Sequence, residues 1–497
     1  MSTILVIGTG PMMSDDVKKL SGHCLRTWHF VKPLLDDGHN IDLYTLNIFM
    51  AKDEGPKDFI TTLKRDGFQY RLLDERWGSL WEYLQNIYEK RKFDCILGIN
   101  TDPSAWACKI NTAIPVWADL NGWVMAEAQI KAYNDDDDLF LHHYWVQERP
   151  VIRRADVFSA VSMPQLYALY GELATVGRLN KYTYDYKFAY HIPNAIDPEV
   201  VNKAEVIRSS NERFLRGKIV ENNAFVVLWS GGYNTWVDVD TLFKGLEGAI
   251  SENSNIHFVS TGGEISTHSE KHYYKFQSLI EQSKYKNNFH LLGWIEGKNI
   301  PLCYTEADVG INVDSFNNET IFGARNRITN MMVYSLPIIT TLGTEISYDL
   351  KNNNAGITFE IGDWNKLKEK IVYYSNNREE LRQIGVCGKD FALKNYAYGY
   401  TIRACREWAK KPYLSPDNQV KLEKESAINM SLNDKIKRIY LNKLEKNACL
   451  TDDIDDIEQL LISHRDLQII RNKLPYKILK KIKSLFSARK EEEKRNE

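Results

Sequence analysis

Two arginines close together in the second half of the chain could hold an anion. Arg325 and Arg327 stand in the segment 319–345, where Gly323 opens a predicted amphipathic helix that ends before Pro337. The start of a helix presents free backbone N–H groups and a partial positive charge, so two guanidinium groups beside it suit a diphosphate. An ordinary surface helix with two solvated arginines is the alternative interpretation.

A carboxylate at the end of a buried strand is the best candidate for proton transfer. The apolar run 115–118 leads directly into Asp119, so this side chain should lie at a cleft, where it could act as a general base or anchor an acceptor hydroxyl group. An Asx turn is the alternative. His23 and Arg26, just after the first glycine turn, could reach the same cleft, and Glu127 is a lesser candidate.

Two similar halves of the chain would position these groups. The run 4–7 leads into Gly8-Thr9-Gly10, and the run 225–229 leads into Ser230-Gly231-Gly232. A buried apolar run followed by a glycine turn and a helical pattern is typical of a βαβ unit in a parallel sheet. We therefore predict an α/β protein with a doubly wound, Rossmann-like sheet in each half. Because the third glycine of a dinucleotide fingerprint is missing, Gly10 is interpreted as part of a tight turn rather than an NAD site.

Size and composition favour a globular protein in a reducing compartment. The 497 residues suffice for two or three domains, and the net charge of −2 gives no electrostatic case for nucleic-acid binding. Seven scattered cysteines without a CxxC pair argue against a disulfide framework or a zinc site. The first apolar run is too short for a signal peptide, and no stretch approaches the ~20 apolar residues of a membrane span. We expect a cytoplasmic protein.

The last twenty residues before the acidic terminus suit a membrane surface. The segment 471–490 contains eight Lys and Arg and no acid, and its apolar residues recur at helical spacing. A basic amphipathic helix of this kind favours an anionic membrane surface, which would make the protein peripheral on the inner face of the membrane. A solvated, frayed helix and a helix that docks on a partner protein are the alternatives.

Several short motifs then resemble one family. Residues 193–197 (PNAID) resemble the linker I-P-N-G-I-D, residues 291–295 (LLGWI) resemble F-x-G-x-V, and residues 336–339 (LPII) resemble L-P-V-V. Their order and spacing resemble the GT-B glycosyltransferases, most closely the retaining, sugar-nucleotide-dependent family 4 group. This resemblance implies two Rossmann-like domains facing across a cleft. We expect the following boundaries: 1–190 for acceptor binding, 191–395 for donor binding, 396–412 for a helix returning to the first domain, and 413–497 for a charged helical tail.

The resemblance also implies roles for residues of the second half. Gly231 and Gly232 would let the backbone approach the phosphates of the donor, while Arg325 and Arg327 would neutralise the charge on the leaving diphosphate. Further roles follow by position: Trp294 in the base pocket, Asn330 at the ribose hydroxyls, Glu319 at the transferred sugar, and Glu345 as another polar donor-site residue. For both glutamates, helix capping is an equal alternative.

This sequence departs from the family pattern in two places. The family's E-x7-E signature places its glutamates at positions that are Phe322 and Asn330 here, and the G-R…K-G donor motif is altered to residues 230–234 and Lys244-Gly245. The resemblance implies a UDP- or GDP-sugar donor with no cofactor and no metal. The acidic residues 135–138 are interpreted as a solvated turn rather than a metal site.

The resulting prediction is a glycosyltransferase of cell-surface glycan or glycolipid biosynthesis. It would transfer a sugar to a hydroxyl of a glycan or lipid-linked acceptor, with retention of stereochemistry. Two alternatives remain from the sequence. One is a nucleotide-sugar epimerase of the same fold. The other is a non-catalytic subunit that scaffolds a partner enzyme, an interpretation favoured by Asn330 at the position of a family glutamate.

Overall fold

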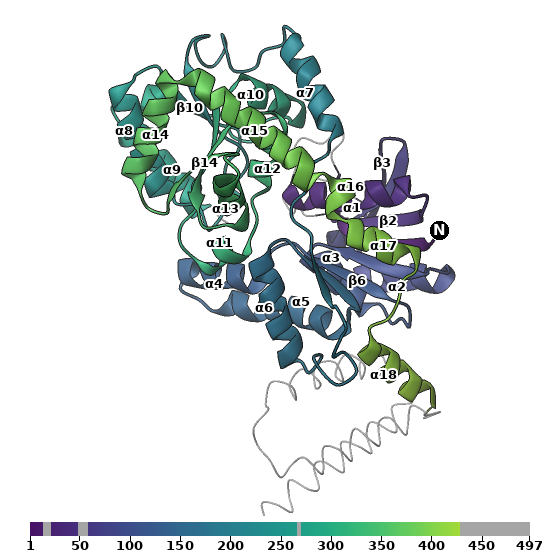
Figure 1. The fold of residues 1–497 in the computed structure, drawn as a ribbon. Coiled ribbons are helices and arrows are strands. Elements are labelled where there is room, and N and C mark those ends of the chain that lie inside the picture. Colours follow the sequence, from purple (N-terminus) through teal and green to yellow (C-terminus); the bar gives the residue numbers. More distant parts are fainter. Residues whose placement is uncertain (13–20, 48–57, 266–269, 428–497) are drawn as a thin grey trace, which may run out of the picture. The chain divides into compact units, whose positions relative to one another are not determined.

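A computed structural model describes residues 1–12, 21–47, 58–265 and 270–427 (Figure 1). Residues 1–422 form one compact unit, and a separate unit begins at residue 423. The predicted basic helix at 471–490 lies outside the described residues. Two lobes make up the first unit, and each contains one of the two Rossmann-like sheets expected from the sequence.

The first lobe is built on a sheet of eight described strands. Except for the antiparallel pair β3–β4, all neighbouring strands are parallel, and β1 lies between β2 and β5. In sheet order the strands are β3 (Ile60–Arg65), β4 (Phe68–Leu73), β2 (Asn40–Asn47), β1 (Thr3–Gly10), β5 (Cys95–Ile99), β6 (Val116–Leu120), β7 (Val157–Ala160) and β8 (Ala189–His191). Its helices are α1 (Gly22–Asp36), α2 (Leu80–Lys90), α3 (Thr101–Lys109), α4 (Val124–Asp135), α5 (Leu139–Arg154) and α6 (Met163–Thr175).

The second lobe is built on a fully parallel sheet of six described strands. In sheet order these are β11 (Phe289–Leu291), β10 (Ile256–Ser260), β9 (Phe225–Trp229), β12 (Val309–Asn312), β13 (Ile338–Leu342) and β14 (Ile357–Glu360). Its helices are α7 (Glu199–Ser209), α8 (Val239–Glu252), α9 (Lys271–Gln282), α10 (Ile300–Glu306), α11 (Asn318–Phe322), α12 (Asn326–Val333), α13 (Glu345–Asn352), α14 (Trp364–Asn376) and α15 (Arg378–Tyr396).

Helices cover both faces of each sheet, which explains why the central strands are apolar throughout. Every residue of β5, β6, β9 and β13 is buried, as expected for parallel strands covered on two sides.

Polar side chains cap the N-termini of several helices. The side chain of Ser162 accepts a hydrogen bond at the start of α6, and that of Asp238 does so at the start of α8.

The chain returns to the first lobe after α15. Ile196, just before α7, forms a bridge with Ala397, and α16 (Tyr398–Thr401) and α17 (Arg403–Lys410) then lie next to α1 (Figure 1). On this lobe Trp408 packs against Trp117 at 5.5 Å between ring centroids, and the guanidinium of Arg406 pairs with Asp37. The last described helix is α18 (Pro416–Ala427).

Candidate active site

Three loops of the second lobe meet where β9, β10 and β11 end. A Cβ on Gly262, after β10, would lie 2.1 Å from the carbonyl oxygen of Gly231, after β9, so these two loops touch backbone to backbone. Gly231 has φ +94°, which favours glycine. The carboxyl edge of a parallel sheet is where open α/β folds bind ligands.

Trp294 closes this loop cluster from the side of β11. Its indole N–H donates to the carbonyl of Glu264 at 2.9 Å, and its ring lies 3.3 Å from the position that a Cβ on Gly232 would take. The ring is half-buried, so it is both a packing residue and a wall of the loop cluster. Its predicted contact with a base remains a prediction.

Arg327 reaches this loop cluster from α12. Its Nη2 donates to the carbonyl of Gly232 at 2.7 Å, and its guanidinium carbon lies 3.8 Å from the ring centroid of Trp229. Its Nη1 is buried and has no hydrogen-bond partner among the described residues, although the residue as a whole keeps some solvent exposure. Burial lowers the pKa of Arg327 to about 10, and the nearby charge of Arg325 adds to this effect.

Backbone donors lie beside this guanidinium. Within the described part of the chain, the N–H groups of Gly231 and Gly232 have no hydrogen-bond partner, while the carbonyl of Gly231 accepts from the Trp229 indole at 3.0 Å. An unpaired buried cation next to free amides is costly and is the arrangement expected of an anion site.

Arg325, only two residues away, is in a different situation. Its Nε donates to Asp314 at 3.0 Å, and its Nη1 and Nη2 donate to Glu319 at 3.0 and 2.7 Å. Weaker contacts with the carbonyl of Ala324 and the hydroxyl of Thr320 use the remaining N–H groups. Burial disfavours its charge, but the two carboxylates outweigh burial and raise the pKa of Arg325. In this arrangement Arg325 has no free N–H for a diphosphate.

Glu319 is the buried partner in this ion-pair group. Burial raises the pKa of Glu319 to about 7 against the opposing effect of Arg325, and the charges of Asp314 and Glu127 add to burial. The carboxyl group therefore titrates near neutral pH, which is the range of a proton-transfer group. Its side chain is 10% exposed, so Glu319 retains a little access to the cleft.

The predicted start of the arginine helix was wrong. Gly323 does not open α12: it ends the separate short helix α11, which is capped by the side chain of Asn317. Residues 324 and 325 are extended or loop-like, and α12 begins at Asn326 with Arg325 as its N-cap. Asn330 is half-buried on α12, and no described residue hydrogen-bonds its side chain.

Glu345 touches the first lobe. Its carboxylate accepts from the backbone N–H of Met163 at 2.5 Å, at the start of α6, and lies 3.1 Å from Nε2 of His191. Next to it, the hydroxyl of Ser162 donates to the carbonyl of Phe322 at 2.6 Å. In this conformation Glu345 therefore holds the lobes together instead of facing the glycine loops.

The expected role of Asp119 as a general base has no support in the geometry. The carboxylate is fully buried and makes two hydrogen bonds of 2.7 Å with Arg26, while the hydroxyl of Ser159 donates to it at 2.6 Å. Arg26 is buried as well and donates to the carbonyl of Ile192 at 2.9 Å, at the exit from the first lobe. Asp119 thus orients Arg26, and Arg26 fixes the linker.

The other acceptor-side candidates, Gly10, His23 and Glu127, each have contacts of their own. The predicted tight turn at Gly10 was wrong: Gly10 is the last residue of β1 and faces Thr45 of β2, where a Cβ would lie 2.3 Å from the hydroxyl oxygen, so its small size serves sheet packing. His23 is exposed at the start of α1, and the neighbouring Gly22 touches the side chain of Asn326 in the second lobe. Glu127 accepts from the hydroxyl of Tyr144 at 3.3 Å.

Asn100 was not identified from the sequence. It directly follows β5 with φ 75° and ψ 161°, a conformation that is strained for any residue except glycine. Its side chain donates to Thr9 at 2.9 Å and accepts from Asn121 at 3.0 Å, and its backbone N–H points to Asp119. An Asn at the end of an apolar strand is the only signal that the sequence offers.

Two negative findings concern the described residues alone. No helix there is both long and apolar enough to cross a bilayer. Nor does that part of the chain bring three or more His, Cys, Asp or Glu side chains together as a metal site.

Comparison with known proteins defines the class. Residues 224–377 match the family model described as glycosyl transferases group 1. Among curated proteins, none matches the sequence significantly. Sucrose-phosphate synthase from Thermosynechococcus elongatus superposes with a TM-score of 0.60 at 12% identity, covering 83% of this chain and 99% of its own.

Two further solved structures have bound ligands. Anabaena HepE in complex with UDP and glucose has a TM-score of 0.56 at 12% identity and covers 82% of this chain and 100% of its own. The E. coli trehalose-6-phosphate structure bound with UDP-2-fluoro glucose has a TM-score of 0.59 at 9% identity and covers 83% and 100%. At such identities the likeness establishes the fold, which is GT-B. The fold and the matched domain together make this protein a glycosyltransferase of GT-B fold.

Proposed function

We propose that the enzyme binds a nucleotide-diphosphate sugar at the loop cluster of the second lobe and transfers the sugar to an acceptor hydroxyl. One observation carries this proposal: among the described residues, Nη1 of Arg327 and the backbone N–H groups of Gly231 and Gly232 have no hydrogen-bond partner, while Nη2 of Arg327 binds the carbonyl of Gly232 in the same loop. The UDP and UDP-sugar complexes of two proteins of the same fold support a UDP-sugar in particular. A GDP-sugar stays within the proposal, and no cofactor beyond the donor is required.

The chemistry follows from charge on the leaving group. As the glycosidic bond breaks, negative charge grows on the diphosphate, and fixed donors aimed at it lower the barrier. Arg327 and the two glycine amides would supply these donors without a metal ion. Arg325 acts indirectly: its guanidinium group donates two hydrogen bonds to Glu319, which orient that carboxyl group and offset its negative charge.

Glu319 is our candidate for contact with the transferred sugar or for proton transfer. Its pKa of about 7 allows it to exchange a proton near neutral pH. Retention of stereochemistry, which the resemblance to family 4 implies, would let the leaving phosphate take the proton of the acceptor. We propose the retaining course for this reason, and Glu319 would then stabilise the sugar.

A role in cell-surface glycan or glycolipid synthesis is proposed from the sequence. The basic segment 471–490 motivates a cytoplasmic enzyme that is peripheral on the inner face of an anionic membrane. It lies outside the described residues, so vesicle sedimentation of the full chain with and without this segment is its test. Equal sedimentation of both chains would contradict membrane binding.

The test of the main proposal uses donors and one matched pair of variants. UDP, GDP, ADP and CMP are first titrated calorimetrically, and radiolabelled sugars of the nucleotides that bind are then incubated with membrane lipid and glycan extracts. We expect one nucleotide to bind and its sugar to be transferred, and Arg327→Met to weaken both. Arg382→Met is the control, since this arginine pairs with Glu379 at an exposed site on α15. No binding of any nucleotide, or equal effects of both variants, would refute the donor site. Binding without transfer, or isomerisation of the free donor, would instead indicate the scaffold or epimerase alternative.

A further inference from the structure

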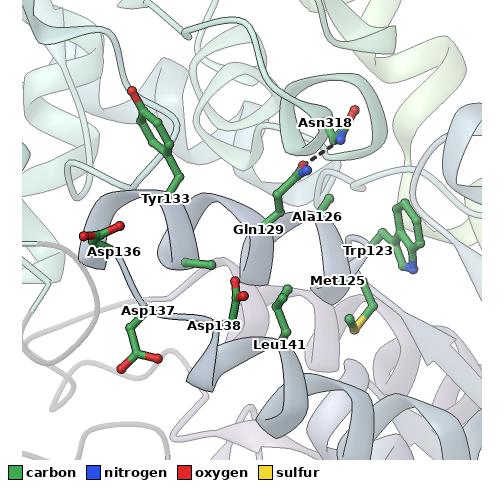
Figure 2. Close-up of a pocket in the computed structure, with 11 residues that line it drawn as sticks. Trp123, Met125, Ala126, Gln129, Tyr133, Asp136, Asp137, Asp138, Leu141 and Asn318 are labelled. Carbon is green, nitrogen blue, oxygen red and sulfur yellow. Dashed lines mark hydrogen bonds between the residues drawn. The ribbon is translucent and has the colours of Figure 1, made fainter.

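An open cavity of about 580 Å³ lies along α4 and the turn into α5, with one contribution from the second lobe (Figure 2). Its volume falls within the range of small-molecule and cofactor sites. The lining residues are Trp123, Met125, Ala126, Gln129, Ala132, Tyr133, Asp136, Asp137, Asp138, Leu141 and Asn318.

Two aromatic rings lie at opposite ends of the α4 side of this cavity. Trp123 is held in place, because its indole N–H donates to Glu172 at 2.9 Å and its ring packs edge to face on Phe322 at 4.9 Å. Tyr133 is 87% exposed, although a large aromatic ring gains free energy on burial. A rigid ring just before α4 and an open ring near the end of this helix, both lining the cavity, suit a ligand with flat apolar faces.

Polar groups complete the lining. The side-chain amides of Gln129 and Asn318 form a 2.6 Å hydrogen bond between the two lobes at the edge of the cavity (Figure 2). Asp136, in a left-handed turn with φ 53°, and Asp138 are exposed at the end of α4, while Asp137 caps the backbone N–H of Leu139. Carboxylates accept strong hydrogen bonds from hydroxyl groups and repel anions.

The position of the cavity connects it to the proposed transfer centre. Phe322, on which Trp123 packs, is followed by the loop that carries Arg325, and Asn318 directly precedes Glu319. A molecule that fills the cavity would therefore lie next to the point where the two lobes meet. Neither the matched domain, which covers residues 224–377, nor the donor site includes the α4 face.

We infer that this cavity binds the acceptor through a neutral, polyhydroxylated glycan portion. The apolar C–H faces of sugar rings would stack on Trp123 and Tyr133, and sugar hydroxyls would donate to the aspartates and the amide pair. The negative charge of the aspartates disfavours a phosphorylated sugar at this place. The inference rests on the proposed function and adds to it the class of acceptor.

The test measures the binding of the acceptor and the binding of the donor nucleotide separately. The full chain is first saturated with the nucleotide that binds in the donor screen. It is then titrated calorimetrically with maltotetraose, cellotetraose, mannotetraose and their 6-phosphates. We expect at least one neutral tetrasaccharide to bind, and its 6-phosphate to bind less tightly. Tyr133→Ser should weaken the neutral ligand about 2- to 10-fold and leave nucleotide binding unchanged. Tyr184→Ser is the control, since this tyrosine is 94% exposed outside the cavity.

A charge variant tests whether the aspartates favour a neutral glycan over a phosphorylated one. Asp136→Asn keeps a side chain that tolerates the left-handed turn and removes one negative charge, so it should narrow the difference between the neutral and phosphorylated tetrasaccharides. The inference is overturned if no neutral glycan binds while the nucleotide does, if Tyr133→Ser has no effect on glycan binding, or if the 6-phosphate binds as tightly as the neutral tetrasaccharide. If the wild type binds no nucleotide, the proposed donor site is refuted instead.

Discussion

Replacing Arg327 with methionine should make the ligand-free protein more stable and its nucleotide binding weaker. The buried guanidinium has a pKa of about 10 against its ordinary value of 12.5, which corresponds to about 3 kcal/mol of unfavourable charge burial. Methionine removes this cost but loses the hydrogen bond from the charged group to Gly232, about 1.5 kcal/mol, and the stacking on Trp229, about 1 kcal/mol. The unfolding free energy should therefore rise slightly, by about 0.5 kcal/mol.

Arg325→Met provides the matched comparison two residues away. Its removal would leave Asp314 and Glu319 buried without their cation, at a cost of about 3–5 kcal/mol. The two variants should thus change the stability in opposite directions. For Arg327→Met we also expect a loss of about 1.5–3 kcal/mol in nucleotide binding, since a hydrogen bond to a charged group is removed.

Urea unfolding followed by tryptophan fluorescence measures the first effect, and calorimetry with UDP or GDP measures the second. A loss of 1.5–3 kcal/mol corresponds to about 10- to 150-fold in Kd. If Arg327→Met destabilises the protein as much as Arg325→Met, the Arg327 guanidinium is paired and is not a free cation. If Arg327→Met binds the nucleotide as tightly as the wild type, Arg327 does not contact the diphosphate.

Three further predictions test the surroundings of the site. Gly262→Ala should destabilise the protein by about 1–3 kcal/mol in urea unfolding, because its Cβ would lie 2.1 Å from the backbone of Gly231, whereas Gly263→Ala, with its nearest atom at 3.6 Å, should be tolerated. Asp119→Asn should cost about 3–5 kcal/mol in unfolding free energy but leave the shape of the pH–rate profile unchanged, and loss of the acid limb of that profile would restore its role as a general base. Burial raises the pKa of Glu172 to about 7, so the folded protein keeps a proton that the unfolded chain releases above its ordinary value of 4.5. This contribution to stability is present below about pH 4.5 and is lost as the pH rises through about 7, and Glu172→Gln should flatten the measured slope across that window.

Several features followed from local sequence. The apolar runs before Gly8 and Ser230 predicted β1 and β9 correctly, because buried parallel strands require continuous apolar residues. The predicted glycine turn follows β9 but not the first run, since β1 continues through Gly10. The segment 319–345 was likewise correctly expected to contain a helix that ends before Pro337. These are properties of neighbouring residues, which a single sequence displays.

Partners from distant strands decided the rest. Arg325 and Arg327 look alike in the sequence, yet Asp314 at the end of β12 takes up one guanidinium and the loop after β9 receives the other. Asp119 and Arg26 stand 93 residues apart, so the sequence could not show that each neutralises the other. The sequence by itself determined which elements form, because that depends on local apolar pattern and turn chemistry. Only the tertiary structure decided which charges are free, because burial and pairing depend on what the fold places beside them.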